Sequence, residues 1–157
     1  MYIKLLNENE IHHGFKYKFG KNVCLDFKPD IECGFGLHFT DSDNFYKWLT
    51  YSNATHFRNI FYIKELISYP EEYKYKAKII SLGKKRPISE LLNTIKIQIL
   101  VIKENPDNIK FIKNPDKLIQ ELAVTLKPDT IRYLNPTLEI QKLAIKLDKT
   151  SINFIKK

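Results

Sequence analysis

The chain has 157 residues, of which 43% are hydrophobic and 13% aromatic, and its formal net charge is +8 at pH 7. This length suffices for one domain or two small ones with a buried core, and the apolar content excludes an intrinsically disordered chain. No apolar run approaches the roughly 18 to 20 residues of a membrane span, and the first residues are strand-like rather than a signal peptide. The two cysteines, Cys24 and Cys33, are too few for a disulfide framework, so we expect an intracellular protein.

The positive charge permits binding to nucleic acid or to another polyanion through contacts with phosphate groups. The same charge is typical of a lysine-rich composition that has no such role. Three of the basic residues are arginines, the preferred readers of phosphates and bases, and these are Arg58, Arg86 and Arg132. The charge therefore leaves DNA or RNA open as a partner without favouring it strongly.

Residues 1–85 predict a small α+β domain. Apolar or alternating segments predict strands at residues 2–6, 15–19, 23–27, 34–39, 57–66 and 73–82. After the fourth segment, Thr40 or Asp41 is a good N-cap for a helix that runs to about Thr50. All glycines, cysteines and histidines of the chain lie before residue 85. The segment 83–87 therefore marks a domain boundary, and Pro87 suits the first turn of a following helix.

Lysines alternate with aromatic or apolar residues in two of the predicted strands, so they share one face of each strand. These lysines are Lys16 and Lys18 in the first strand and Lys74, Lys76 and Lys78 in the second. If the two strands are neighbours, the lysines form one basic surface for a polyanion. The alternative is a solvated face that protects an edge strand. The sequence favours this alternative, because nothing in it places the strands together.

Residues 86–157 contain three copies of a repeat with a period of about 21 to 22 residues. Each copy carries a glutamine and, thirteen positions later, an aromatic residue, in the pairs Gln98 and Phe111, Gln120 and Tyr133, and Gln141 and Phe154. The apolar spacing follows a helical period, and Asn-Pro pairs at 105–106, 114–115 and 135–136 predict helix starts. We expect each copy to form a longer and a shorter helix that stack on the next copy. The predicted fold class is therefore α+β, a small mixed sheet domain followed by all-α helical-hairpin repeats.

The last copy keeps the apolar positions and ends in Ile155-Lys156-Lys157, a charged end that is typical of a capping repeat. Stacked repeats form extended binding faces. We therefore expect a small, basic, non-catalytic binding module whose repeats contact a protein partner, with DNA or RNA as a further candidate partner. A self-assembling structural protein, and hence a homo-oligomer, is an alternative.

The repeat unit, in segments 119–124, 128–131 and 135–137, resembles short helical repeats in proteins of giant DNA viruses of amoebae. Segments 13–17 and 36–41 are similar to an uncharacterised domain found in these viruses and in phages. Together the two resemblances cover nearly the whole chain. They imply a viral accessory protein in the host cytoplasm or the virion, and they imply no particular reaction.

A second resemblance is to the ADP-ribosyltransferases, through His13-Gly14, the segment 34–42 and Tyr46. In that family's pattern a His-Gly strand, a later serine and a tyrosine hold the nicotinamide end of NAD. The resemblance implies that His13, Gly14, Ser42 and Tyr46 bind this cofactor. The chain departs from the pattern because no glutamate lies in the expected late strand. The nearest glutamates to that position are Glu65 and Glu90.

Other patterns for catalysis or metal binding are weak. The spacing of Cys24, Cys33 and the histidines matches no structural zinc pattern. The sequence also lacks a phosphate-binding loop, a dinucleotide-binding fingerprint and a serine-hydrolase elbow. We therefore predict no catalytic residue, no metal and no resident cofactor outside the ADP-ribosyltransferase alternative. His12 and His38 are interpreted as turn or surface residues, and Trp48 as a core residue of the predicted helix.

Overall fold

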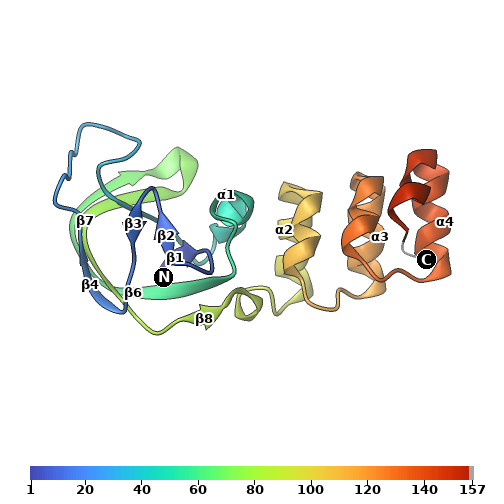
Figure 1. The fold of residues 1–157 in the computed structure, drawn as a ribbon, viewed down its shortest axis with the longest axis horizontal. Helices are drawn as coiled ribbons and strands as arrows, with labels where there is room; N and C mark the ends of the chain where they lie inside the picture. The colour runs from blue at the N-terminus through green and yellow to red at the C-terminus, as the bar shows by residue number, and fades with distance from the viewer. Residues whose placement is uncertain (156–157) are drawn as a thin grey trace. The chain divides into compact units, whose positions relative to one another are not determined.

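The structure, a computed structural model, describes residues 1–155 and combines strands and helices in two compact units. The first unit spans Met1–Ile88, and the second begins at Ser89 (Figure 1). The chain is therefore a mixed α/β protein. The predicted boundary segment 83–87 does not begin a helix, because Arg86 and Pro87 form a short strand. The expectation that Pro87 lies in the first turn of a helix is wrong.

The first unit contains strands and short helical turns. Its strands are β1 (Tyr2–Leu6), β2 (Ile11–His12), β3 (Phe15–Lys16), β4 (Gly20–Val23), β5 (Leu37–Asp41), β6 (His56–Tyr69), β7 (Lys74–Leu82) and β8 (Arg86–Pro87). Its helices are the 3-10 helix η1 (Phe45–Trp48), the α-helix α1 (Leu49–Ser52) and the 3-10 helix η2 (Pro70–Glu72). A further 3-10 turn, η3 (Ile88–Glu90), crosses the boundary between the units.

Four strands of the first unit close into a ring. β1 pairs with β5 on one edge and with residues 56–59 of β6 on the other, while β7 pairs with β5 and with residues 60–69 of β6. All of these pairings are antiparallel. Because β5 and β6 each join β1 to β7, the sheet curls into a small barrel (Figure 1). β4 pairs with the second half of β7, and β8 pairs with the start of β6.

The core of this unit is built from apolar side chains of several strands. It contains Leu6, Tyr17, Leu37, Phe39, Ile60, Ala77, Ile80 and Leu82. Burial of each large side chain of this kind contributes roughly 1.5–3 kcal/mol relative to exposure. Phe45 and Leu49, the apolar residues of the helical segment, are also buried. The curled sheet therefore encloses a core even though its individual strands are short.

Two of the predicted strands differ from the observed ones. In the segment 15–19 only Phe15 and Lys16 pair, with β2, and Tyr17 turns into the core. The strand predicted at 23–27 instead begins at Gly20 and ends at Val23. Aromatic alternation alone therefore overstated the first strand, because Tyr17 packs into the core while Lys18 and Phe19 remain exposed.

The predicted helix from residue 40 or 41 to residue 50 is shorter than expected. Residues 40 and 41 belong to β5, and Asp41 Oδ1 accepts hydrogen bonds from the backbone N–H groups of Asp43 and Asn44. This local turn delays the first helical residue to Phe45. Asn53 adopts a left-handed conformation with φ of 44° and ends the helix. The result is two short turns in place of one regular helix.

The second unit repeats one pattern of two helices. The pairs are α2 (Ile95–Glu104) with η4 (Pro106–Phe111), α3 (Lys117–Leu126) with η5 (Pro128–Tyr133), and α4 (Leu138–Leu147) with η6 (Lys149–Phe154). The aromatic residue of each copy is the last residue of its 3-10 helix. Consecutive α-helices contact one another, and Ala123 and Ala144 are fully buried at these contacts. Small side chains at these positions let the helices approach closely.

The repeated glutamines have the same structural role in each copy. The side-chain amide donates to a carbonyl oxygen just before the helix, at Leu92 for Gln98, Pro115 for Gln120 and Pro136 for Gln141. Each amide thus satisfies a loop carbonyl that has no partner within the helix. The glutamine marks the repeat in the sequence because the connection between copies needs this donor.

The helix starts differ from those predicted by the Asn-Pro pairs. Asn105 does cap η4, since its side chain accepts from the backbone N–H of Asp107. However, α3 is capped by Asp116, whose Oδ1 accepts from the N–H of Ile119 at 2.9 Å, and Thr137 is the residue before α4. The expectation that the other two asparagines cap α-helices is wrong, because the proline carbonyls that follow them are held by the glutamines.

The last copy leaves part of its apolar surface uncovered. Ile109 and Ile131 are buried, whereas the equivalent Ile152 is 60% exposed. The predicted charged end falls partly on residues 156–157, which lie outside the described residues. Within residues 1–155 the last copy therefore ends on an apolar rather than a charged surface.

Candidate functional site

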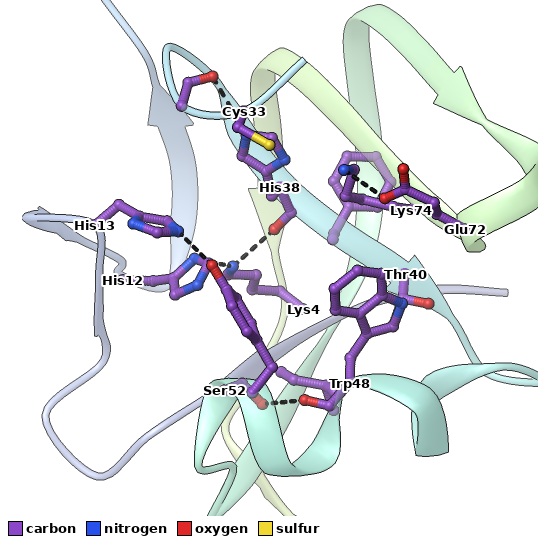
Figure 2. A pocket seen from close by; sticks show the side chains of 14 residues that line it. Lys4, His12, His13, Cys33, His38, Thr40, Trp48, Ser52, Glu72 and Lys74 are labelled. Carbon is purple, nitrogen blue, oxygen red and sulfur yellow. Dashed lines mark hydrogen bonds and ion pairs between the residues drawn. The ribbon is translucent and has the colours of Figure 1, made fainter. Parts of the chain in front are cut away.

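The first unit contains a pocket of about 300 Å³. Residues from β1, β5, η1, α1, the β2–β3 turn and the start of β7 line it, together with Cys33 and Gly34 of the loop before β5 (Figure 2). The wall side chains that carry its polar and aromatic chemistry are Lys4, His12, His13, His38, Trp48, Tyr51, Glu72 and Lys74. A mostly apolar concave site with a few polar groups is the usual form of a ligand pocket.

Lys4 is a buried cation on the wall of the pocket. It lies within β1, and only 3% of its surface is exposed. Its Nζ donates to the backbone oxygen of His38 at 2.7 Å, lies 3.1 Å from His12 Nδ1, and is 4.6 Å from the centre of the Tyr17 ring. Burial lowers the pKa of Lys4 from 10.5 to about 7. Within residues 1–155 no carboxylate forms an ion pair with it.

His12 and His38 flank the Lys4 ammonium (Figure 2). Burial, followed by the nearby positive charge of Lys4, lowers the pKa of His12 to about 3. Burial also lowers the pKa of His38 to about 4. Both rings are therefore neutral near pH 7. Since a lysine ammonium only donates, His12 Nδ1 accepts from Lys4 and the hydrogen of this ring is on Nε2.

Two buried ring nitrogens of the pocket walls have no hydrogen-bond partner within residues 1–155. They are His12 Nε2 and Trp48 Nε1. Indole nitrogen is a donor only, and the contact with Lys4 makes His12 Nε2 a donor as well. A buried donor without an acceptor costs about 1–3 kcal/mol. Both nitrogens are enclosed by protein atoms, so they are unsatisfied donors inside the walls.

Aromatic rings form a large part of the remaining wall. Tyr51 packs edge-on against Trp48, with ring centres 5.8 Å apart, and against His12 at the same distance. Its hydroxyl lies 3.0 Å from His13 Nε2. His13 adopts a left-handed backbone conformation with φ of 49°, at the tight turn between β2 and β3. The turn thus brings two consecutive histidines against the helix that carries Tyr51.

The residues implied by the ADP-ribosyltransferase resemblance do not share one wall. His13 lines the pocket, and Gly14 lines a neighbouring hollow of about 380 Å³. Ser42 and Tyr46 line neither cavity, and Ser42 instead contacts the N-terminal amine at 3.3 Å. The four residues are therefore not assembled around one cavity in the described part of the chain.

The lysines of the predicted basic surface have different surroundings. Lys16 and Lys18 are exposed, Lys78 is half exposed and forms an ion pair with Glu65, and Lys74 forms ion pairs with Glu32 and Glu72. Lys76 is 0% exposed, and its Nζ donates to the backbone oxygens of Lys28 and Ile31. A polyanion cannot reach the ammonium of Lys76 in this conformation. Binding of a polyanion by the remaining lysines stays a prediction.

Sequence reasoning missed several residues of the pocket. Lys4 interrupts an otherwise apolar strand, and this interruption was the available signal, because a charged residue within a buried strand requires partners. His12 and His38 were interpreted as surface residues and Trp48 as a core residue, yet all three lie on the pocket walls. Among residues 1–155 no group of three or more histidine, cysteine, aspartate or glutamate side chains is placed to hold a metal ion.

Comparisons of the chain with protein-family models, with curated proteins and with solved structures found no match. The resemblances to giant-virus proteins and to ADP-ribosyltransferases therefore stay predictions. In the described part of the chain, no helix is both long and apolar enough to cross a bilayer.

Proposed function

We propose that this protein is a small, basic, non-catalytic binding module. In this proposal a small α+β unit holds a pocket for a small ligand, and three tandem helical repeats offer a surface to a protein partner. The observation that carries the proposal is a pocket of about 300 Å³ whose wall includes Lys4, a buried cation with no carboxylate partner within residues 1–155. Buried charges are otherwise nearly always paired.

The low pKa values of two histidines make them hydrogen-bonding groups rather than proton carriers. A general acid or base works best when its pKa lies near the working pH. The pKa values of His12 and His38, about 3 and about 4, are too low for proton transfer near neutrality. Neutral imidazoles remain effective hydrogen-bonding groups. In the proposal these two rings therefore contact a ligand without transferring protons to it.

Trp48 offers a direct test, because it is the one tryptophan of the chain. Its indole N–H gives a single side-chain resonance in a nitrogen–proton correlation spectrum. We expect a screen of small polar aromatic compounds to shift this resonance and to change Trp48 fluorescence. A broad screen that leaves both signals unchanged would contradict the ligand pocket. Release of nicotinamide from NAD by the purified protein would contradict the non-catalytic assignment and favour the enzyme alternative.

Exposed aliphatic side chains on the helices support the proposal that the repeats bind a protein partner. They are Ile95, Leu100, Leu118, Leu126, Leu138, Leu147 and Ile152. Leu126 and Leu147 occupy the same position in successive copies, at the ends of α3 and α4. Aliphatic groups that recur along a stack form a contact surface of the kind that solenoid proteins use.

Two measurements test whether the repeats bind a protein partner. We expect the Leu126→Lys and Leu147→Lys double variant to lose a partner that is cross-linked to the wild-type protein in cells, whereas Lys18→Met keeps it. Sedimentation equilibrium at several concentrations should give a constant mass. A mass that rises with concentration would favour the self-assembling alternative. If the protein binds DNA or RNA, its affinity should fall steeply as the salt concentration increases.

A further inference from the structure

The pocket has one positive charge without a counter-ion. Of its charged wall residues, Lys74 and Glu72 neutralise each other at 2.6 Å, and Lys74 also contacts Glu32 at 2.9 Å. Lys4 has only uncharged neighbours, namely His12, the His38 carbonyl and the Tyr17 ring. A buried charge is stable only when it is paired and hydrogen-bonded. Lys4 is therefore the position on the walls where, within residues 1–155, a negatively charged group of a ligand would find an unpaired cation.

The polar atoms beside Lys4 match an acceptor group. An ammonium has three donors, and the contacts to His38 and His12 use two of them. The third donor is left for an acceptor of the ligand, and a carboxylate oxygen can accept it. Charge-assisted bonds of this kind are the stronger class of hydrogen bond.

The other walls match a flat ring. Trp48 and Tyr51 pack edge to face, and Phe39 and His13 also line the cavity. Figure 2 shows Lys4 between His12 and His38, with Trp48 on the opposite side of the view from the two consecutive histidines. An aromatic ligand with its charged end at Lys4 would thus contact rings along its body.

The volume limits the size of the ligand. About 300 Å³ lies at the lower end of the range for ligand pockets, roughly 300–1,000 Å³. A molecule with one or two rings fits this space better than a dinucleotide does. A phosphate dianion is also a poorer match than a carboxylate, because only one uncompensated cation is available.

We propose that the ligand of this pocket is a planar aromatic monocarboxylate, held by its carboxylate at Lys4 and by its ring against Trp48 and Tyr51. The proposal deepens the proposed function and rests on it, since it names the class of the pocket's ligand. It concerns binding only and involves no covalent step.

Matched pairs of acids and amides test the proposal with the full-length protein. Nicotinate is compared with nicotinamide, and benzoate with benzamide, by calorimetry and by the Trp48 indole resonance. We expect each acid to bind at least tenfold more tightly than its amide. Equal binding, tighter binding of the amides, or tighter binding of AMP or NAD would overturn the carboxylate assignment while leaving the ligand pocket in place. No response to any compound of this set or of the broad screen would contradict both proposals.

The pH dependence provides a second readout. The titratable groups around the Lys4 ammonium are His12 on β2, His38 on β5 and Tyr17 after β3, with His13, Cys33, Glu72 and Lys74 elsewhere on the walls. Because the free protein loses the Lys4 proton above about pH 7, acid affinity should fall about tenfold per pH unit between roughly pH 8 and pH 9.5. An affinity that stays constant over this range would overturn the role of Lys4.

Two variants test whether Lys4 causes the preference for acids over amides. Lys4→Met keeps the length of the side chain without its charge, and it should remove the tenfold preference for acids. Lys18→Met, at an exposed lysine of the same unit, is the matched control and should retain the preference. If Lys4→Met does not fold, the ratio of acid to amide affinity and the pH profile of the wild-type protein still test the proposal. A folded Lys4→Met variant that prefers acids as the wild type does would contradict the proposal.

Discussion

At the scale of single residues, two lysines inside the first unit place a positive charge away from water, which is costly unless the charge has partners. Lys4 and Lys76 lie in strands that pair on both edges, and both are almost fully buried. Lys76 is held by backbone oxygens of the segment 28–31, whereas Lys4 has fewer partners and faces a pocket. The first arrangement fastens a loop to the sheet, and the second leaves a charge for a ligand to neutralise.

The role of Lys76 predicts a large stability effect. Replacing it by Met leaves backbone oxygens of the loop without their charged donor, so we expect the free energy of unfolding to fall by about 3 kcal/mol. Lys78→Met, two residues along β7 and half exposed, should change it by less than about 0.5 kcal/mol. Urea unfolding followed by Trp48 fluorescence measures both variants. Similar effects for the two variants would contradict the fastening role of Lys76.

Gly36 belongs to the same arrangement. A Cβ atom at Gly36 would lie 2.3 Å from Cγ of Lys76, whose stem passes over the glycine. The glycine is therefore required by the path of a buried side chain, and its backbone needs no left-handed conformation.

The lowered pKa of Lys4 predicts how stability depends on pH. Its folded value of about 7 lies below the ordinary value of 10.5, so the unfolded chain binds the proton more readily between these values. The destabilisation is complete below about pH 7 and is lost as pH rises toward the ordinary pKa. Relative to Lys4→Met, the wild type should gain up to ~1.4 kcal/mol per pH unit between about pH 7.5 and 9.5. Parallel stability curves for the two proteins would show that Lys4 is not desolvated.

At the scale of elements, the repeats are set by how each helix begins. The observed cap of α3 is Asp116, not the asparagine of the preceding Asn-Pro pair. The prolines instead supply carbonyls to the glutamines, which places the cap one residue beyond each proline. The sequence pattern thus assigned the cap correctly at Asn105, but at Asn114 and Asn135 it assigned the cap to the wrong residue.

The capping role of Asp116 predicts that its replacement destabilises the protein more than replacement of Asn135 does. Asp116→Ala removes the acceptor for the N–H of Ile119, and it should lower the free energy of unfolding by about 1 kcal/mol. Asn135→Ala, at the exposed asparagine of the next Asn-Pro pair, should have an effect within about 0.5 kcal/mol. Thermal unfolding followed by circular dichroism at 222 nm compares the two. A larger loss for Asn135→Ala would restore the capping predicted from the sequence.

At the scale of the whole molecule, the two units bury their side chains in different ways. The first depends on strand pairs between residues far apart in the chain, such as Tyr2 with Asp41. The second depends on contacts between neighbouring copies, including the cation–π contact of Arg132 with Phe154 at 4.1 Å. Position within the stack therefore decides how buried a repeated residue is.

The stack predicts unequal effects at equivalent positions. Ile131→Ala empties a buried site between copies and should cost about 2–4 kcal/mol. Ile152→Ala removes an exposed side chain and should cost less than about 0.5 kcal/mol. Chemical denaturation of the two variants measures the difference. Equal costs would mean that the last copy is covered in solution, and sedimentation would then identify whether a second copy covers it.

Local patterns in the sequence were sufficient for the mixed α/β character, the main strands at 2–6, 57–66 and 73–82, and the helical period after residue 86. These features depend on residues close together in the chain, whose spacing alone decides which side chains share a face. The site residues were predictable only in part, since His13 was singled out while Lys4, His12, His38 and Trp48 were not.

Only the tertiary structure decided that the sheet closes and that Lys4 and Lys76 lie inside it. Alternation places a lysine on one face of a strand, but whether that face meets water depends on which distant strand pairs beside it and how the sheet curls. The pocket exists because β1, the turn after β2, β5 and α1 meet around one buried ammonium. No local pattern carries that information, because the contacts that form the pocket join residues 8 to 38 positions apart.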